Sequence, residues 1–265
     1  MIFTKNKFIV STLLMFFAST SMSYAESTTW VFETGASEYD VDSYTSEFGN
    51  QLSVDSDNDG TADLTIEAWA STGCGLYCGN DNEVEQGYAS TNAWGLLNNN
   101  LDEGLSNNSS HTVDNKGGDV DMMLLSFTES TALTGIDLGW AYNDTDISIA
   151  AFSNLPTLSG NTWAEIATQS IFSASFSNIG TSPYTLVNEV SNVVVEAQYW
   201  LVGAYTSVFG NLGSNDDSYD DRIKIASITT ETTASTPVAE VPEPSTIMFF
   251  ALFGLILVSR RKATK

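Results

Sequence analysis

The chain has 265 residues, of which 42% are hydrophobic and 16% are charged, and its 33 acidic residues against nine basic ones give a formal charge of −24. Nucleic acid and anionic lipid are therefore poor partners, because both would be repelled. Cations, neutral glycans and basic partners stay open, as does the simpler interpretation that acidity keeps a secreted protein soluble.

The first 25 residues have the three parts of a signal peptide. Lys5 and Lys7 precede an apolar run over residues 8–18, and small and polar residues follow as far as Ala25. The run is shorter than the about 20 apolar residues that a transmembrane helix needs, and the small side chains at its end suit signal peptidase. We therefore expect export by the secretion machinery and cleavage after Ala25.

Residues 26–228 alternate short β-like runs with clusters of Gly, Asn, Asp and Ser. Apolar side chains recur at every second residue in residues 28–34 and 64–70, which is the period of a strand. Runs of the same character cover residues 121–127, 133–140, 146–152, 171–176, 193–205 and 222–228, and residues 163–169 also fit a short helix. The pattern predicts one all-β domain, an antiparallel β-sandwich of jelly-roll-like type.

An acidic segment between Val54 and Leu64 has oxygen-bearing side chains at alternate positions. The candidate ligands are Asp55, Asp57, Asp59, Thr61 and Asp63, and Gly60 suits a sharp turn. The segment resembles the start of an EF-hand-like calcium loop, but position twelve is Ile66 instead of a bidentate glutamate. We expect either a weak calcium site or an acidic hairpin loop.

The two cysteines, Cys74 and Cys78, are four residues apart in a glycine-containing loop. In an oxidising compartment a local disulfide between them is the leading interpretation. It would add little global stability, because closing a short loop removes little chain entropy. A zinc site is disfavoured, since no second pair of Cys or His residues is present.

Two pairs of aspartates are candidates for catalysis. Asp119 and Asp121, like Asp144 and Asp146, are two residues apart and would share one face of a strand. Glycoside hydrolysis needs a defined distance between carboxylates that spacing does not show, and calcium binding, turn capping or solvent exposure is commoner for such residues. His111 is the only histidine and there is no Gly-x-Ser-x-Gly motif, so we predict no catalytic residues.

Large aromatic residues keep a second function open. Trp69, Trp94, Tyr142 and Trp200 would stack on sugars if exposed, or fill the core if buried. A calcium-dependent carbohydrate-binding module is therefore the main alternative to a structural role, and an enzyme acting on polysaccharide is a third class.

The C-terminal part begins with residues 229–240, a stretch rich in Thr, Ser and Pro that predicts a solvated linker. The apolar run over residues 247–258 follows, and Arg260, Arg261 and Lys262 would act as a cytoplasmic stop. Twelve residues of helix reach about 18 Å, against a hydrocarbon core of roughly 30 Å, which suits a temporary anchor in the inner membrane.

Residues 241–265 as a whole resemble the PEP-CTERM sorting tail: Pro242, Glu243 and Pro244 precede the apolar run, and the basic cluster closes it. The resemblance implies that an exosortase recognises the motif, removes or transfers the chain near it, and delivers the protein to the cell surface or extracellular matrix. The body between the termini keeps only Lys116, Arg222 and Lys224 against 32 acidic residues, a formal charge of −29.

Five segments of the body resemble a family of exosortase-dependent surface proteins: His111–Asn115, Asp121–Phe127, Leu138–Trp140, Asn143–Ile147 and Tyr199–Tyr205. This resemblance implies location and sorting and brings no catalytic chemistry. The sequence thus predicts a non-enzymatic structural or biofilm-associated protein, with exopolysaccharide as a candidate partner and no nucleic acid.

Overall fold

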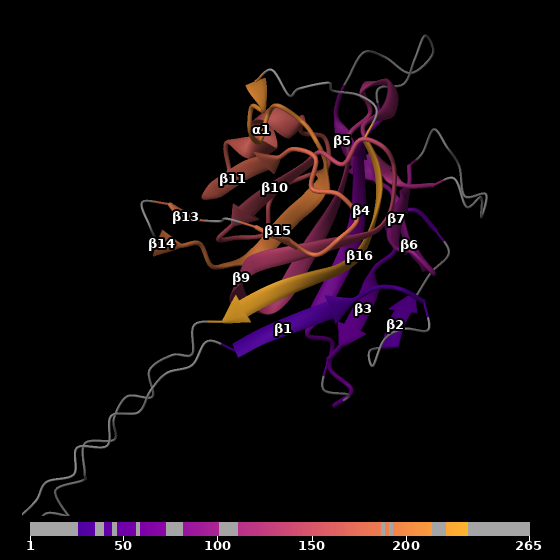
Figure 1. Ribbon diagram of the computed structural model, residues 1–265, viewed down its shortest axis with the longest axis vertical. Helices are drawn as coiled ribbons and strands as arrows, with labels where there is room; N and C mark the ends of the chain where they lie inside the picture. The colour runs from indigo at the N-terminus through magenta and orange to yellow at the C-terminus, as the bar shows by residue number, and fades with distance from the viewer. Residues whose placement is uncertain are drawn as a thin grey trace, which may run out of the picture. The chain divides into compact units, whose positions relative to one another are not determined.

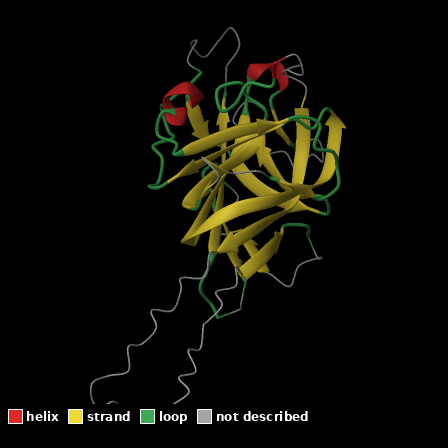
Figure 2. Cartoon of the chain, turned by 60° about the vertical axis from the view of Figure 1, so that its left-hand side comes forward, coloured by secondary structure: helices red, strands yellow, loops and turns green. Residues whose placement is uncertain are grey.

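The structure is a computed structural model that describes residues 26–34, 40–43, 47–56, 59–72, 82–100, 111–186, 189–190, 193–213 and 221–232. Almost all regular structure in these residues is strand, and every pair of strands is antiparallel (Figure 2), so the all-β antiparallel prediction is confirmed. The predicted signal peptide, residues 233–240 of the linker and the sorting tail lie outside the described residues. Within the described part, no helix is long and apolar enough to cross a membrane.

Strand β9 (Asp121–Asn143) is 23 residues long and belongs to two groups of strands (Figure 1). Its first part lies between β4 (Leu64–Ser71) and β15 (Ala197–Ala204). Its second part, from Ala132 onward, pairs with β16 (Asp221–Thr232). Residues 121–127 and 133–140, predicted as separate strands, are therefore one continuous strand that connects the two groups.

The first group extends from β9 in both directions. On the β15 side follow β10 (Ile147–Phe152) and β11 (Phe172–Phe176), and on the β4 side follow β3 (Leu52–Asp55), β2 (Asp40–Ser43) and β5 (Val84–Gln86). All six residues of β10 are buried, because this part of the sheet is covered on both faces. Such strands carry near-continuous apolar runs instead of alternation.

The second group is built on β16. One side of β16 pairs with β9, which also pairs with β12 (Tyr184–Thr185). The other side pairs with β1 (Glu26–Val31), β8 (Val113–Asp114) and β7 (Gly95–Asn99), and β6 (Tyr88–Asn92) forms a hairpin with β7. Two short strands, β13 (Glu189–Val190) and β14 (Val193–Val194), pair only with each other among the described residues.

The main hydrophobic core contains side chains from both groups of strands, including Phe32, Ile66, Leu125, Trp200 and Ile225. Trp200 is fully buried, and its indole Nε1 donates hydrogen bonds to the carbonyl oxygens of Thr131 (3.1 Å) and Ala197 (3.2 Å). The buried indole therefore keeps its polar atom satisfied, as a stable core requires.

A second apolar cluster lies on the other face of the first group, under the short helix α1 (Trp163–Ala167). The helix begins with a capping box: Thr162 Oγ1 accepts a hydrogen bond from the Glu165 amide, and the Glu165 carboxylate accepts one from the Thr162 amide. Trp163 and Ile166 face the cluster, where Trp163 meets Phe209 edge-on at 6.1 Å. The short helix expected at residues 163–169 is thus present and ends two residues earlier.

The start of the predicted linker needs a correction. Residues 229–232 belong to β16, paired with β1 on one side and β9 on the other. This stretch lacks apolar periodicity, but its threonines are β-branched and suit a strand in the middle of a sheet. As a result Glu26, the first described residue, is paired with Thr232, the last one.

Candidate metal centre

Three aspartates converge at the end of the body where β9, β10 and β16 meet: Asp144, Asp146 and Asp221. One carboxylate oxygen from each residue lies within 4.8 Å of those from the other two. Asp144 and Asp146 are in the turn that joins β9 to β10, and Asp221 is the first residue of β16. Asn143, which begins the turn, has a φ of 64°, a left-handed conformation that asparagine tolerates better than most residues.

Backbone and side-chain amides hold these carboxylates in place. Asp221 Oδ1 accepts a hydrogen bond from the Asp146 amide (2.8 Å), and Asp221 Oδ2 accepts one from Asn115 Nδ2 (2.6 Å). Asp146 Oδ1 accepts from the Asn178 amide (2.6 Å), whose residue has a φ of 51°. Neutral amides orient the three groups without neutralising their charge.

Burial makes this concentration of charge costly. Asp146 and Asp221 are only 1% and 2% exposed. Burial, together with the charges of the neighbouring Asp146 and Asp144, raises the pKa of Asp221 to about 7 despite the lowering effect of the amide hydrogen bonds. No described lysine or arginine is among the groups that lower the pKa of Asp221. A proton or a cation bound at Asp221 would relieve this cost.

The donor set fits a hard cation. Carboxylate oxygens are the ligands that Ca²⁺ prefers, at about 2.3–2.6 Å, so that two oxygens on opposite sides of the ion are at most about 5 Å apart. Three oxygens within 4.8 Å of one another satisfy that limit. The three aspartates can hold a metal ion.

Two further buried aspartates nearby are in a different electrostatic environment. Asp121 accepts hydrogen bonds from Asn100 Nδ2 (3.1 Å) and from the Asp114 amide (3.4 Å). Burial raises the pKa of Asp114, but the positive charges of Arg222 and Lys116 lower it. Arg222 and Lys116 act on Asp114, whereas no described basic group is among those that shift the pKa of Asp221, so the cluster of Asp144, Asp146 and Asp221 is the better cation site.

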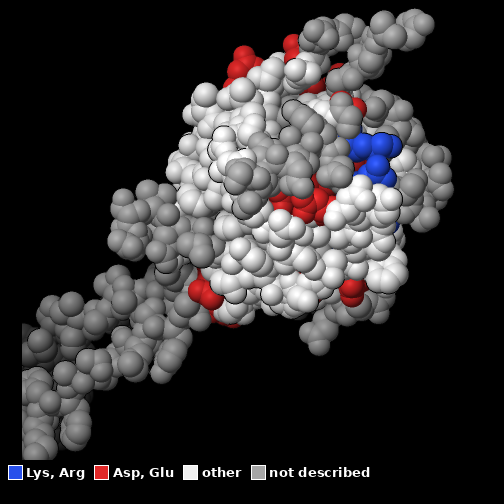
Figure 3. Space-filling model, turned by 45° about the horizontal axis from the view of Figure 1, so that its top comes forward, with Lys and Arg blue, Asp and Glu red and all other residues white. Residues whose placement is uncertain are grey.

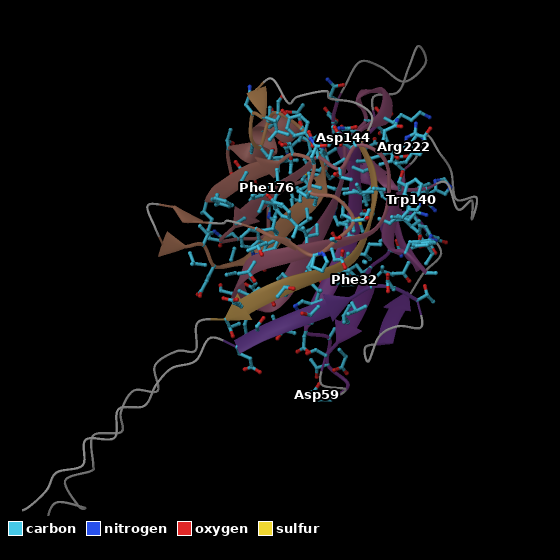
Figure 4. The ribbon with its side chains drawn as sticks, viewed as in Figure 1. Phe32, Asp59, Trp140, Asp144, Phe176 and Arg222 are labelled. Carbon is cyan, nitrogen blue, oxygen red and sulfur yellow. The ribbon has the colours of Figure 1, made fainter. Side chains whose placement is uncertain are left out.

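The predicted acidic loop lies at the opposite end of the body, as the positions of Asp59 and Asp144 in Figure 4 show. Its described carboxylates accept hydrogen bonds from the loop itself: Asp55 from the amides of Asp59 (3.2 Å) and Gly60 (2.7 Å), Asp59 from the Thr61 amide (2.8 Å), and Asp63 from Ser56. Within the described ranges only Asp144, Asp146 and Asp221 form a group of three acidic side chains. Asp57 lies outside those ranges, and calcium binding in the loop stays a prediction.

Some of the other predicted residues lie outside the described ranges, and the aromatic candidates are either buried or exposed. The disulfide residues Cys74 and Cys78 and the processing residues Ala25 and Pro242–Pro244 lie outside the described residues, as do Arg260–Lys262. Of the aromatic candidates, Trp69 and Trp200 are buried in the two cores, at 7% and 0% exposure, whereas Trp94 and Tyr142 are 52% and 51% exposed. The sugar-stacking interpretation therefore stays a prediction for the second pair alone.

Sequence reasoning singled out Asp144 and Asp146 but missed Asp221, which is 75 positions after Asp146. The available signal was an Asp-Asp pair directly before the apolar run of β16. In comparisons with known proteins, no family model, no curated protein and no solved structure matches this chain.

Proposed function

We propose that this protein is an exported, non-enzymatic surface or extracellular-matrix protein whose body is an antiparallel β-sandwich stabilised by calcium. The single observation that carries the calcium role is the convergence of Asp144, Asp146 and Asp221, two of them buried, with carboxylate oxygens within 4.8 Å. Calcium is abundant outside cells, and a cation there would offset the negative charge of three carboxylates held close together.

The pairing of the two ends of the body supports export and exosortase processing. Since Glu26 pairs with Thr232, both ends of the described body lie side by side. Cleavage after Ala25 and processing at Pro242–Pro244 would therefore remove segments outside every described strand. Signal peptidase and an exosortase are the partners in this proposal, and the inner membrane holds the precursor.

The interpretation as a jelly-roll-like sandwich is supported by the main core. That core takes side chains from β3, β4, β10 and β15 in the first group and from β1 and β16 in the second. Two sheets that bury one shared apolar layer and are joined by a strand passing between them are typical of sandwiches whose strands switch sheets.

The calcium role is tested by thermal unfolding of the full chain in mild detergent, first with a chelator and then with calcium. At a calcium concentration about 100 times the Kd, binding to the folded state adds about 2.7 kcal/mol, which raises the Tm by about 5–10 °C for a domain of this size. Asp146→Asn combined with Asp221→Asn should abolish the rise while circular dichroism shows an unchanged β-signal.

The matched control is Asp57→Ala combined with Asp59→Ala in the acidic loop, which should leave the calcium-dependent rise intact. If the loop variant abolishes the rise and the buried variant retains it, the ion binds in the predicted loop instead. If calcium does not change the Tm of the unsubstituted protein, neither site binds calcium.

Processing is tested by intact mass spectrometry of protein collected from the surface of exosortase-positive cells. The mature chain should begin near Glu26 and end close to Pro242–Ser245. Replacing Pro242, Glu243 and Pro244 with alanine should leave export unchanged and trap the longer, membrane-bound form. A wild-type surface protein that still carries Arg260–Lys265 would contradict the proposal.

A further inference from the structure

The outer face of the β9–β16 pair carries a ladder of aromatic and basic side chains. Arg222 of β16 is opposite Tyr142 of β9, and Lys224 is opposite Trp140. Residues two apart along a strand point to the same side of the sheet, so the four side chains share one face. Figure 4 shows Trp140 and Arg222 on the same side of the body.

Ring contacts order this ladder. The rings of Trp140 and Tyr142 are stacked, with centroids 6.3 Å apart and planes 10° from parallel. The Arg222 guanidinium lies 5.2 Å from the centre of the Tyr142 ring, and Lys224 Nζ lies 5.4 Å from the Trp140 ring. Each aromatic ring is thus held by a cation–π contact from the neighbouring strand, which fixes it before any ligand arrives.

A third aromatic residue extends the face. Trp94, in the turn between β6 and β7, is about as exposed as Tyr142. Its carbonyl oxygen passes so close to Gly139 that a Cβ added there would be 2.3 Å away, so the turn lies directly on β9 beside Trp140. Large aromatic residues that remain exposed yet ordered are typical of surfaces that stack on a ligand.

The charge of this face is unlike that of the rest of the body. The three basic residues between the termini are Lys116, Arg222 and Lys224, against 32 acidic ones. Arg222 and Lys224 are on the ladder, and the charges of both Arg222 and Lys116 act on Asp114, the residue paired with Arg222 on the side of β8. Figure 3 shows Lys and Arg atoms gathered in one place beside acidic ones.

Only two of the three basic groups are available to a ligand. Lys224 is buried, whereas Lys116 is exposed and Arg222 is partly exposed. The planar guanidinium of Arg222 presents the fork of donors that matches a carboxylate, and it lies beside the exposed Tyr142 ring. If a sugar ring stacked on Tyr142, a carboxylate carried by the sugar would lie within reach of Arg222.

We propose that the aromatic face, defined by Trp94, Trp140, Tyr142, Lys116 and Arg222, binds a carboxylated polysaccharide. The sugar rings stack on Tyr142 and Trp94, and the carboxylates pair with Arg222 and Lys116. The proposal rests on the surface or matrix role, because a protein at the cell surface or in the matrix would meet such a polysaccharide.

Charge distribution favours this ligand over two others. A neutral glycan would leave the body's gathered basic groups without a role. Nucleic acid carries one charge per about 1.7 Å of duplex, so a body of charge −29 would repel it strongly. A more sparsely charged polysaccharide is less affected, because salt screens the distant acids beyond about 8 Å while the contacts with Arg222 and Lys116 persist.

The test is affinity electrophoresis of the full chain in mild detergent, through native gels that contain hyaluronan, dextran or single-stranded DNA. Hyaluronan should retard the protein, with a retardation that decreases as salt is added, and dextran and DNA should not. Tyr142→Ala and Arg222→Gln should each weaken binding about tenfold, the loss expected for one charged hydrogen bond or one stacking contact. Arg222→Lys should recover part of the loss, and Leu155→Ala, an exposed apolar residue outside the face, should bind as wild type.

If dextran retarded the protein as much as hyaluronan, the carboxylate would not be needed for binding, and the proposal would be wrong. If the Tyr142 and Arg222 variants bound hyaluronan as strongly as the wild type, the proposed location would be wrong. If DNA retarded the protein, the proposed class of ligand would be wrong. The gels are run in chelator, so that this test does not depend on an ion at the metal centre. If the protein binds hyaluronan but its Tm does not depend on calcium, only the calcium role is refuted. If its Tm depends on calcium but it does not bind hyaluronan, only the proposal for the aromatic face is refuted.

Discussion

The stability of the metal-free protein should fall as pH rises from 5 to 8, because Asp221 must lose its proton in a buried site. Its pKa rises from an ordinary 3.8 to about 7 in the folded chain, so the folded state binds more protons than the unfolded state in this range. Stability contributed by the protonated form is complete below the unfolded pKa and is lost as pH passes through the folded one.

The size of the effect follows from the two pKa values. A difference of about three units corresponds to about 4 kcal/mol over the whole titration, and about 2.5 kcal/mol of that falls between pH 5 and pH 8. For a domain of this size, that loss lowers the Tm by about 5–10 °C. Calcium should remove most of the dependence, since the ion neutralises the carboxylates that the proton otherwise neutralises.

The assay is urea unfolding in chelator at a series of pH values, compared between wild type and Asp221→Asn. The variant cannot titrate at this position, so its loss of stability between pH 5 and pH 8 should be smaller by about 2.5 kcal/mol. Glu129→Gln, which removes an equal charge at an exposed site, should follow the wild-type curve. Parallel curves for wild type and Asp221→Asn would refute the reasoning, as would a wild-type stability that rises toward pH 8 more steeply than that of the variant.

Two further predictions concern the fold. Gly95→Ala should destabilise the protein by more than Gly60→Ala in urea unfolding. Both glycines have positive φ, at 110° and 88°, but a Cβ at Gly95 would lie 2.1 Å from the Ile225 carbonyl oxygen, whereas Gly60 faces open space. Equal losses of stability would show that this close approach is absent. Trp200→Ala should cost about 3–5 kcal/mol, because it empties a fully buried site between two groups of strands, and a loss under about 1 kcal/mol would place Trp200 outside the core.

Local signals in the sequence predicted the class of fold well. Period-two alternation located strands such as residues 64–70, where Leu64, Ile66 and Ala68 are buried in the main core. The short helix expected at residues 163–169 is present as α1, the one α-helix of the described residues, and the Thr162–Glu165 capping box at its start is a local pattern that the sequence analysis did not use. Both signals depend on neighbours within a few positions, which the sequence displays directly.

Long-range pairing explains what the sequence did not reveal. Nothing near Thr229 indicates that β1, about 200 positions earlier, will pair with it, so the local sequence predicts a linker there. The same limit hid Asp221, because its place beside Asp144 and Asp146 depends on the register between β9 and β16. Exposure of Trp94 and Tyr142, in contrast to Trp69 and Trp200, also depends on which strands cover each face.

Because the metal centre and the aromatic face adjoin on β16, calcium should strengthen binding of the polysaccharide. Asp221 and Arg222 are consecutive residues of one strand, so their side chains point to opposite faces: one to the metal centre, the other to Tyr142. An ion at the metal centre cancels negative charge close to where a carboxylate would pair with Arg222.

Coupling between two such sites is reciprocal and typically changes affinity about 5- to 150-fold. We expect the lower end of that range, since nine further pairs between β9 and β16 hold Arg222 opposite Tyr142 without the ion. Hyaluronan retardation measured with calcium and with chelator gives the ratio of the two affinities. Asp146→Asn combined with Asp221→Asn should reduce this ratio to one. A ratio of one in the wild-type protein, with calcium shown to bind by its Tm, would mean that the two sites act independently.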